Sequence, residues 1–376
     1  MSEVNVKKGL EGVIADTTKV SKVMPEINAL VYKGYPVGDL AENCEFEEVA
    51  YLLWNDELPN EKQLADFKAS ERKYRTISQD LVDVIKKFPK TAHPMDTVRT
   101  GVSFLGMEDE RTFDNSEEVN RDKALRLFSA IPTIIAADYR ARNNMEIIAP
   151  KSDLSFSENF FHMCFGEVPE KEVVKAFDVS LILYAEHGFN ASTFTSRVIT
   201  STTSDMYSAI TGAIGALKGP LHGGANEQVM HMLKEVESPE TAKEWMLDAL
   251  KNKKKVMGFG HRVYRSGDSR VPTMKKYAAG LGKWKGEEKW QQISDILEQT
   301  MIDEKNIYPN LDFPAGPAYY LMGFEIDMFT PIFVMARITG WSAHVMEQIA
   351  ENRIIRPLCQ YIGPGERKFI PMKERS

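Results

Sequence analysis

Three histidines that lie next to a glycine are the residues best suited to chemistry in this 376-residue chain: His187, His222 and His261. Histidine exchanges a proton near neutral pH, and glycine allows a tight turn in which the backbone approaches a ligand. A fourth segment, bounded by two prolines, carries a single carboxylate, Asp312. Carboxylates and imidazoles are the groups that move protons in carbon-acid chemistry. The four positions predict a site assembled from distant loops.

Each of these residues also has a structural alternative. His187 follows an apolar segment that reads as a helix, so it could stabilise the helix C-terminus as a cation. His222 could be a core histidine, but the two glycines after it predict a loop-to-helix junction where backbone donors converge. Asp312 lies among turn-forming residues and could be an ordinary turn residue. Taken one at a time, the residues leave both interpretations open.

Other kinds of site fit the sequence poorly. His261 ends a Gly-Phe-Gly-His string, but no predicted strand precedes it, so we reject a dinucleotide-binding loop. The histidines show no HExxH motif or other recognised ligand spacing, which argues against a metal. The His222-Gly-Gly string is also found in acyl hydrolases, yet residues 101–105 lack the final glycine of a nucleophile elbow. A hydrolase remains a minor alternative, as does a non-catalytic helical scaffold.

Basic residues indicate the kind of ligand. Arg270, Arg337 and Arg356 could grip carboxylates through their guanidinium forks, which suits a small di- or tricarboxylate. Four lysines between residues 251 and 255 lead directly into the His261 segment. They either stabilise the C-terminus of a helix or contact a phosphorylated ligand.

Composition limits the class of protein. With 43% hydrophobic and 27% charged residues, the chain resembles a globular protein, and its net charge of −7 argues against a nucleic-acid surface. There is no run of about 18 apolar residues and no secretion signal, so we expect no membrane association and a cytoplasmic location. Cys44, Cys164 and Cys359 are far apart, so neither a disulfide framework nor a thiolate metal site is expected.

The periodic signals that must position these residues are nearly all helical. Apolar residues recur at helical spacing, or helix-start and helix-end residues occur, in segments 204–217, 239–250, 287–305 and 330–351. In the last segment Thr330 reads as an N-cap and Pro331 as a first-turn proline. The exceptions are a short hairpin arm near residues 30–35 and an exposed loop at 108–120. The fold class is therefore predicted to be all-α.

Five strings together resemble the citrate synthase family over nearly the whole chain: LKGPLHGGANE, MGFGHRVY, YPNLDFPAG, ARITGWSAH and NRIIRP. The resemblance implies the all-α citrate synthase fold and a homodimer. It also implies a large domain of residues 1–221 and 318–376 and a smaller mobile domain of residues 222–317, with the active site in the cleft between them. Turns at 219–224 and 314–317 could bracket the moving segment.

The same resemblance assigns roles within the site. Asp312 would remove a proton from the acyl carbon of an acyl-CoA, His222 would hydrogen-bond the thioester oxygen, and His261 would donate to the keto oxygen of oxaloacetate. No cofactor beyond the coenzyme A co-substrate is implied. The implied oxaloacetate-binding residues are His187, Arg270, Arg337 and, from the partner subunit, Arg356. The implied coenzyme A-binding residues are Lys255, Val256, Met257, Gly258, Phe259 and Arg265. A further basic residue of the site is not placed, although Arg72 and Arg75 are candidates.

Within the family, segments 44–50, 91–96 and 184–194 look most like 2-methylcitrate synthases, which condense propionyl-CoA with oxaloacetate and usually accept acetyl-CoA as well. A dedicated citrate synthase is the alternative. After Asp312 the chain has Phe313 to Gly316, where many members carry an aromatic residue and a serine. This departure could leave room for the extra methyl group or could be neutral. One methylene in an apolar pocket is worth only about 1 to 3 kcal/mol of specificity, so both activities can coexist.

Overall fold

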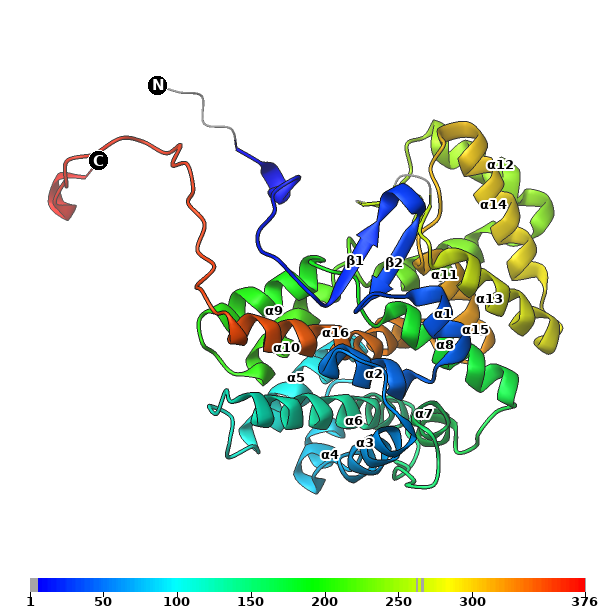
Figure 1. The fold of residues 1–376 in the computed structure, drawn as a ribbon. Helices are drawn as coiled ribbons and strands as arrows, with labels where there is room; N and C mark the ends of the chain where they lie inside the picture. Colours follow the sequence, from blue (N-terminus) through cyan, green and yellow to red (C-terminus); the bar gives the residue numbers. More distant parts are fainter. Residues whose placement is uncertain (1–5, 262, 265–266, 376) are drawn as a thin grey trace.

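Helices dominate the computed structural model, which describes residues 6–261, 263–264 and 267–375 (Figure 1). The all-α prediction is confirmed. The helices of the first half are α1 (Val37–Asn43), α2 (Phe46–Asn55), α3 (Glu61–Lys73), α4 (Gln79–Ile85), α5 (Pro94–Met107), α6 (Glu117–Arg142), α7 (Phe156–Phe165), α8 (Lys171–Tyr184) and α9 (Ala191–Ser201). Those of the second half are α10 (Met206–Leu217), α11 (Ala225–Val236), α12 (Pro239–Lys251), α13 (Val271–Lys285), α14 (Lys289–Lys305), α15 (Asp312–Leu321) and α16 (Phe329–Ala350).

A small antiparallel sheet lies near the N-terminus. It consists of β1 (Ser21–Met24), β2 (Ala29–Tyr32) and β3 (Tyr35–Pro36), with Ser21 opposite Tyr32. The hairpin arm predicted near residues 30–35 is confirmed as β2 and β3. Strand β1 was not predicted, because its sequence Ser-Lys-Val-Met does not alternate between polar and apolar residues.

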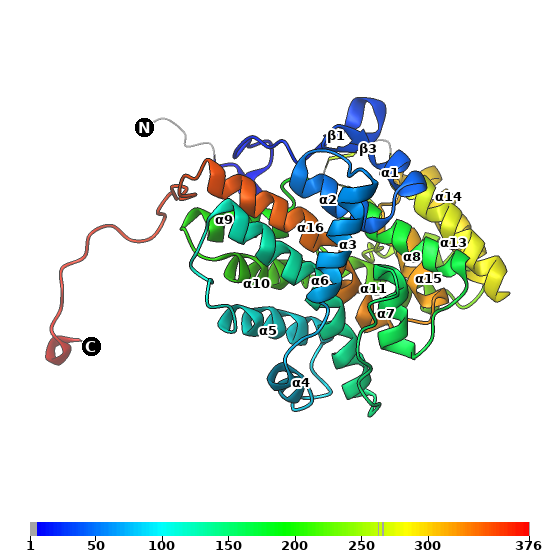
Figure 2. The ribbon, with the colours of Figure 1, turned by 60° about the horizontal axis from the view of Figure 1, so that its bottom comes forward.

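The core is organised around α16, which runs through the middle of the molecule (Figures 1 and 2). Nearly every side chain from Phe329 to Val345 is buried, because α16 packs against α2, α6, α8, α9 and α10. A helix that is apolar on all sides belongs in a protein interior. Arg337, Trp341 and His344 are buried on this helix, and the first of them reaches the candidate site.

A second group, α11 to α15, packs chiefly on itself. It lies to one side of the α16 core in Figure 1 and meets the rest of the chain mainly where α13 contacts α8. The segment after α16 leads away from the body of the molecule (Figures 1 and 2). No described helix is long and apolar enough to cross a bilayer.

Two local predictions are wrong. Thr330 is not the N-cap of α16, because the helix begins one residue earlier and Thr330 lies buried in its first turn. Residues 314–317 are not a turn, because they belong to α15. Pro314 is the third residue of that helix, where a backbone N–H has no intrahelical partner and proline is tolerated. The predicted boundary between residues 317 and 318 therefore falls inside α15.

Candidate active site

Asp312 is the first residue of α15 and is held in place by an aromatic hydroxyl. The Tyr184 hydroxyl, at the end of α8, donates a hydrogen bond of 2.7 Å to Asp312 Oδ1. Burial raises the pKa of Asp312 to about 6, although the Tyr184 hydrogen bond and the charge of Arg270 oppose this rise. A carboxylate with such a pKa is ionised at neutral pH and is a stronger base than an exposed aspartate.

His222 lies in the tight turn between α10 and α11, and its tautomer follows from its neighbours. The backbone N–H of Ser192, which can only donate, points at His222 Nε2 at 3.3 Å, and Ser192 Oγ lies 2.7 Å from the same nitrogen. Nε2 therefore accepts, and the proton of the neutral ring is on Nδ1. Burial and the charge of Arg337 lower the pKa of His222 to about 3. The ring is thus a neutral donor.

His261 has the opposite tautomer. Its Nδ1 accepts the backbone N–H groups of Val263 at 3.0 Å and Tyr264 at 3.3 Å, so the proton of the neutral ring is on Nε2. Burial and the charge of Arg270 lower the pKa of His261 to about 4. His261 also presents one N–H to a ligand without carrying a positive charge at neutral pH.

His187 lies in the turn after α8 and is not a helix-capping cation. Burial and the charge of Arg270 hold the pKa of His187 well below the ordinary value, so the ring is neutral. Its centroid lies 4.9 Å from that of His261. The buried Nε2 of His187 has no hydrogen-bond partner among the described residues. A buried polar atom without a partner costs free energy, and a bound ligand can supply the missing contact.

Two arginines are buried in the same region but differ in their partners. Arg270 donates from Nε and Nη2 to both carboxylate oxygens of Asp268, at 2.9 and 2.6 Å. Arg337 donates from Nε to the Tyr184 carbonyl at 2.7 Å, and its guanidinium lies 4.7 Å from the centroid of the Phe333 ring. Within the described chain, Arg337 has no salt bridge, and burial lowers its pKa to about 10. It is therefore a desolvated cation whose terminal amino groups are available to an anion.

A backbone pairing joins the loops of His261 and Asp312. Phe259 and Pro309 form an antiparallel bridge, in which the Gly260 N–H donates to the Tyr308 carbonyl at 2.8 Å. The Asn310 N–H donates to Gly258 O at 2.9 Å, and its side chain donates to Gly260 O at 3.0 Å. The two segments, about 50 residues apart in sequence, therefore form one local structure.

The predicted residues are linked through shared neighbours. Tyr184 hydrogen-bonds Asp312 through its hydroxyl and Arg337 through its carbonyl, and its ring packs 4.2 Å from that of Phe333. Phe333 also packs against His222, with ring centroids 6.2 Å apart. His187 and His261 pack with ring centroids 4.9 Å apart, and burial and the charge of Arg270 lower the pKa of both. The arrangement offers one base, two neutral donors and a cation that forms no salt bridge with a described residue.

The remaining predicted residues lie at the edge of this region or beyond it. Lys255 is exposed, whereas the residues from Val256 to Phe259 are partly or fully buried against the core. Arg356 is exposed on the segment after α16 and forms no ion pair with a described residue. Arg265 lies outside the described residues. Arg75 is committed elsewhere, because it pairs with Glu71 and donates to two backbone carbonyls.

Three residues that hold the site together were not predicted: Tyr184, Ser192 and Asp268. Tyr184 and Ser192 lie in segment 184–194, but nothing in its local pattern shows which side chains they meet 30 to 128 residues away. Asp268 pairs with Arg270 and also accepts the Leu311 N–H at 3.2 Å. The sequence did contain a signal for Asp268, because this carboxylate lies two residues before Arg270, a predicted ligand-binding arginine.

The departure after Asp312 has a packing explanation. A Cβ on Gly316 would lie 3.1 Å from the Asn226 carbonyl, so this glycine allows α15 to approach α11. Phe313 packs against Phe259, with ring centroids 4.5 Å apart. Gly316 therefore gives room to the neighbouring helix α11.

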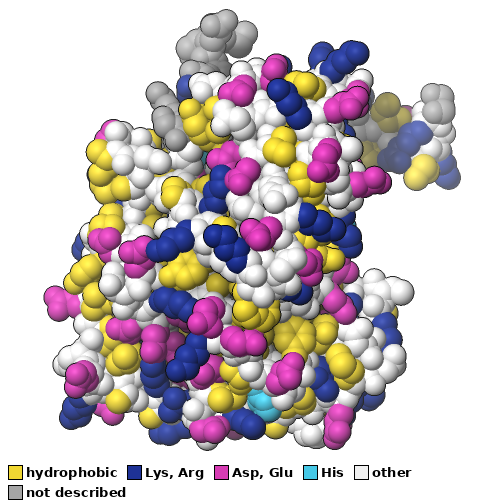
Figure 3. All heavy atoms as spheres, turned by 90° about the vertical axis from the view of Figure 1, so that its right-hand side faces the viewer, with side chains coloured by type: hydrophobic (Ala, Val, Ile, Leu, Met, Phe, Trp, Pro, Cys, Tyr) yellow, Lys and Arg dark blue, Asp and Glu magenta, His cyan; other side chains and the backbone are white. Residues whose placement is uncertain are grey.

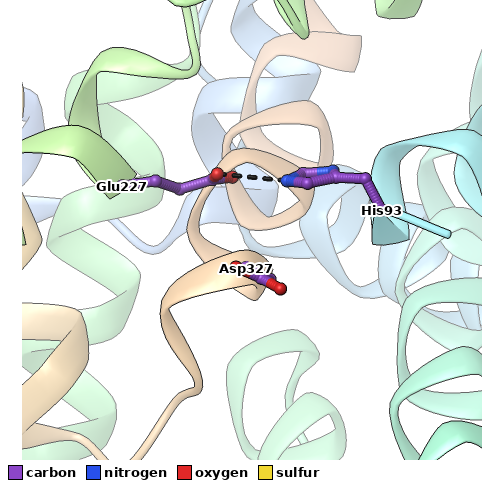
Figure 4. A group of neighbouring side chains, drawn as sticks. All are labelled: His93, Glu227 and Asp327. Carbon is purple, nitrogen blue, oxygen red and sulfur yellow. Dashed lines mark hydrogen bonds and ion pairs between the residues drawn. The ribbon is translucent and has the colours of Figure 1, made fainter. Parts of the chain in front are cut away.

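A group of three side chains has the spacing of a metal site: His93, Glu227 and Asp327 (Figure 4). His93 Nδ1 accepts the Met95 N–H at 3.2 Å, so the neutral ring carries its proton on Nε2, which faces Glu227 at 3.1 Å. A metal would need a lone pair on that nitrogen, so the arrangement fits a hydrogen bond better than a ligand set.

Surface charges are mixed on the side of the molecule seen in Figure 3. Lysines and arginines alternate there with aspartates and glutamates and do not gather into one basic patch. This distribution agrees with the net charge of −7 and does not resemble a nucleic-acid-binding face.

Comparison with known proteins gives a consistent result. A family model described as citrate synthase, C-terminal domain, matches residues 9–358. A 2-methylcitrate synthase of Mycobacterium tuberculosis is 56% identical over 367 residues, which cover 98% of this chain and 93% of the relative. A citrate synthase of Mycolicibacterium smegmatis is 55% identical over 365 residues, or 97% of each chain. The solved ternary complex of carboxymethyl coenzyme A and oxaloacetate with the citrate synthase of Thermoplasma acidophilum has a TM-score of 0.94 and 36% identity, covering 98% of this chain and 99% of that one.

Proposed function

Because this chain belongs to the citrate synthase family, we propose that it condenses an acyl-CoA with oxaloacetate and hydrolyses the thioester product. The observation that carries the proposal is that Tyr184 hydrogen-bonds both a base, Asp312, and a buried arginine, Arg337, which has no salt bridge among the described residues. A dicarboxylate would neutralise such a cation, and the carboxylate of Asp312 would act on the second substrate beside it.

In the proposed reaction Asp312 removes a proton from the acyl carbon while the Nδ1–H of His222 donates to the thioester oxygen. The resulting carbon nucleophile attacks the keto carbon of oxaloacetate, and the Nε2–H of His261 protonates the keto oxygen. Water then cleaves the thioester and releases the coenzyme A thiol. Weak carbon acids react this way only where preorganised donors meet the developing negative charge.

His187, Arg270 and Arg337 are proposed to bind oxaloacetate, and the segment from Lys255 to Phe259 to lie along coenzyme A. The unpartnered Nε2 of His187 supports the first assignment, and the exposed lysine the second. The reaction is proposed to need no metal or other cofactor. Turnover that is lost on treatment with a chelator and restored by added metal would contradict this.

The acyl substrate is proposed to be propionyl-CoA, with acetyl-CoA also accepted, so that the products are 2-methylcitrate and citrate. Relatives of 56% and 55% identity carry the two names, which is why both substrates are considered. The test is the release of free thiol from each acyl-CoA, with and without oxaloacetate. A higher kcat/KM for acetyl-CoA would favour a dedicated citrate synthase, and thiol release without oxaloacetate would favour a hydrolase.

We further propose a cytoplasmic homodimer that acts in propionate catabolism or in the tricarboxylic acid cycle and in which Arg356 completes the partner's site. Arg356 lies on a segment that leads away from its own subunit (Figure 1). The same segment exposes large apolar side chains that a second subunit could cover: Ile354, Leu358, Tyr361, Ile362, Phe369 and Met372. Apolar patches of this kind are typical of subunit interfaces.

Residues 222–317 are proposed to form the small domain and to close on residues 1–221 and 318–376 when oxaloacetate binds. The support is that α11 to α15 pack chiefly on one another. Small-angle X-ray scattering should show a smaller radius of gyration with oxaloacetate. An unchanged radius at saturating oxaloacetate would contradict closure.

A further inference from the structure

The His222 loop, residues 218–224, is a compact turn. Residues that contact the ends of this turn can therefore set the position of His222. Within the turn the His222 N–H and the Gly224 N–H both donate to the Gly219 carbonyl, at 2.9 and 3.3 Å. A Cβ on Gly223 would lie 2.5 Å from the Leu217 side chain, so the turn is packed tightly against α10. A short turn with internal hydrogen bonds moves as one piece.

The N-terminus of α5 contacts the chain on both sides of His222, at the loop before it and at the first turn of α11 after it. Before it, Lys218 Nζ donates to both carboxylate oxygens of Asp96, at 2.8 and 2.7 Å. After it, Glu227 Oε2 accepts from His93 Nε2 at 3.1 Å (Figure 4). Although burial opposes it, the hydrogen bond and charge of Lys218 hold the pKa of Asp96 below its ordinary value.

Glu227 is anchored at its other oxygen as well. Glu227 Oε1 accepts the Thr330 N–H at 3.2 Å and the Thr330 hydroxyl, at the start of α16. The nearly buried carboxylate thus ties the first turn of α11 to both α5 and α16. The orientation of His93 is itself fixed, because its Nδ1 caps α5 by accepting the Met95 N–H.

Resting on the proposed function, we propose that His93 and Asp96 are positioning residues that hold the His222 loop, so that His222 keeps its Nδ1–H aimed at the substrate oxygen. Neither residue needs to touch substrate. They hold the chain on both sides of His222, at Lys218 in the loop and at Glu227 in α11, while Ser192 contacts the ring itself. A shift of about 1 Å in a catalytic group can cost about 100-fold in rate.

The test uses variants that leave helix α5 intact. His93→Asn keeps an N-cap side chain but does not reach Glu227, and Lys218→Met removes the pair with Asp96. Lys218→Arg restores a cation at the same place. Lys275→Met is the matched control, because Lys275 is about as exposed as Lys218 and pairs with Asp295 and Glu298, away from the loop.

The double variant His93→Asn/Lys218→Met should lower kcat by about 10- to 100-fold and change KM for oxaloacetate by less than about twofold, because His222 acts on the acyl-CoA oxygen in the transition state. Lys218→Arg should retain most of the activity, as should Lys275→Met. A double variant that turns over like the Lys275→Met control would overturn the proposal. So would a fall in kcat accompanied by an equal loss of oxaloacetate affinity.

A crystal structure of the double variant provides a measurement that does not depend on turnover. We expect the contact between His222 Nε2 and Ser192 Oγ, which is 2.7 Å here, to be lost or lengthened. An unchanged contact would overturn the proposal even in a protein that condenses neither acyl-CoA. Absence of wild-type thiol release with both acyl-CoAs would instead defeat the proposed function, so the two failures are distinguishable.

Discussion

Burial sets the protonation states of the candidate site. It raises the pKa of Asp312 and lowers the pKa values of His187, His222 and His261, because a low-dielectric interior disfavours the charged form of each group. The result is one ionised base and three neutral imidazoles at neutral pH. A neutral imidazole N–H can still donate a hydrogen bond to the oxygen that gains negative charge as the enolate forms.

The pH dependence of the reaction follows from the pKa of Asp312, which is about 6. Because the base must be ionised, kcat/KM for the acyl-CoA should fall as the pH drops through 6. Tyr184→Phe removes a hydrogen bond that stabilises the carboxylate, so the fall should move to higher pH. A pH–rate profile of both proteins checks this. A profile that stays flat down to pH 5 would show that Asp312 is not the base.

Arg337→Leu should weaken oxaloacetate binding by about 30-fold or more, which corresponds to the loss of about 2 kcal/mol for a buried charge-assisted contact. Glu186 is the carboxylate whose charge acts most on Arg337. It keeps its hydrogen bonds to His344 and Ser21 when Arg337 is replaced by an apolar side chain. The midpoint of thermal unfolding should therefore be maintained. Calorimetric titration with oxaloacetate and a thermal melt test the two parts. Unaltered affinity would remove Arg337 from the oxaloacetate site.

At the scale of elements, local periodicity was enough to predict α10, α12 and α14 to within about two residues, because each buries one face of a helix. It failed where the deciding contact was distant in sequence. The start of α16 and the helical conformation of residues 314–317 depend on packing against α11. The bridge between Phe259 and Pro309 joins residues 50 apart, and no local pattern predicts such a pairing.

The same limit applies to the site. The types of His222, His261 and Asp312 predicted proton chemistry, and the family resemblance supplied their roles. Their tautomers could not be predicted, because they depend on the N–H groups of Ser192 and Val263. These contacts exist only once the chain has folded.

A substitution at Gly258 tests whether the loop that carries His261 depends on close packing at this glycine. Its φ is +81°, and a Cβ there would lie 2.7 Å from Val229 and 3.0 Å from Phe313. Gly258→Ala should lower the free energy of unfolding and reduce kcat. Gly286→Ala is the matched control, because Gly286 has a φ of +70° but no atom within 4 Å of the added Cβ. That control should lose only about 1 kcal/mol, and its kcat should not change. Urea unfolding measures both variants. If they lose the same free energy of unfolding, backbone strain at positive φ, rather than the clash of the added Cβ, accounts for the effect of Gly258→Ala.

At the scale of the whole molecule, the proposed dimer makes a quantitative prediction. Asp312→Asn and Arg356→Leu should each abolish or strongly reduce activity in their own homodimers. In a mixed dimer, one site would have Asp312 from one subunit and Arg356 from the other. Random mixing of equal amounts should therefore restore about a quarter of wild-type activity, since half of the dimers are mixed and half of their sites are intact. No recovery after verified subunit exchange would place Arg356 in the site of its own subunit.

The bridge between Phe259 and Pro309 has a consequence for how the reaction is timed. Because it joins the segments that carry His261 and Asp312, the spacing between proton donor and base is fixed when the chain folds. Arg337 and His187 belong to other elements, so any domain movement would change their distance from this pair together. Substrate binding would then change one distance, that between the His261–Asp312 pair and the residues Arg337 and His187. The enzyme would pass from its resting to its reactive geometry by changing this distance alone.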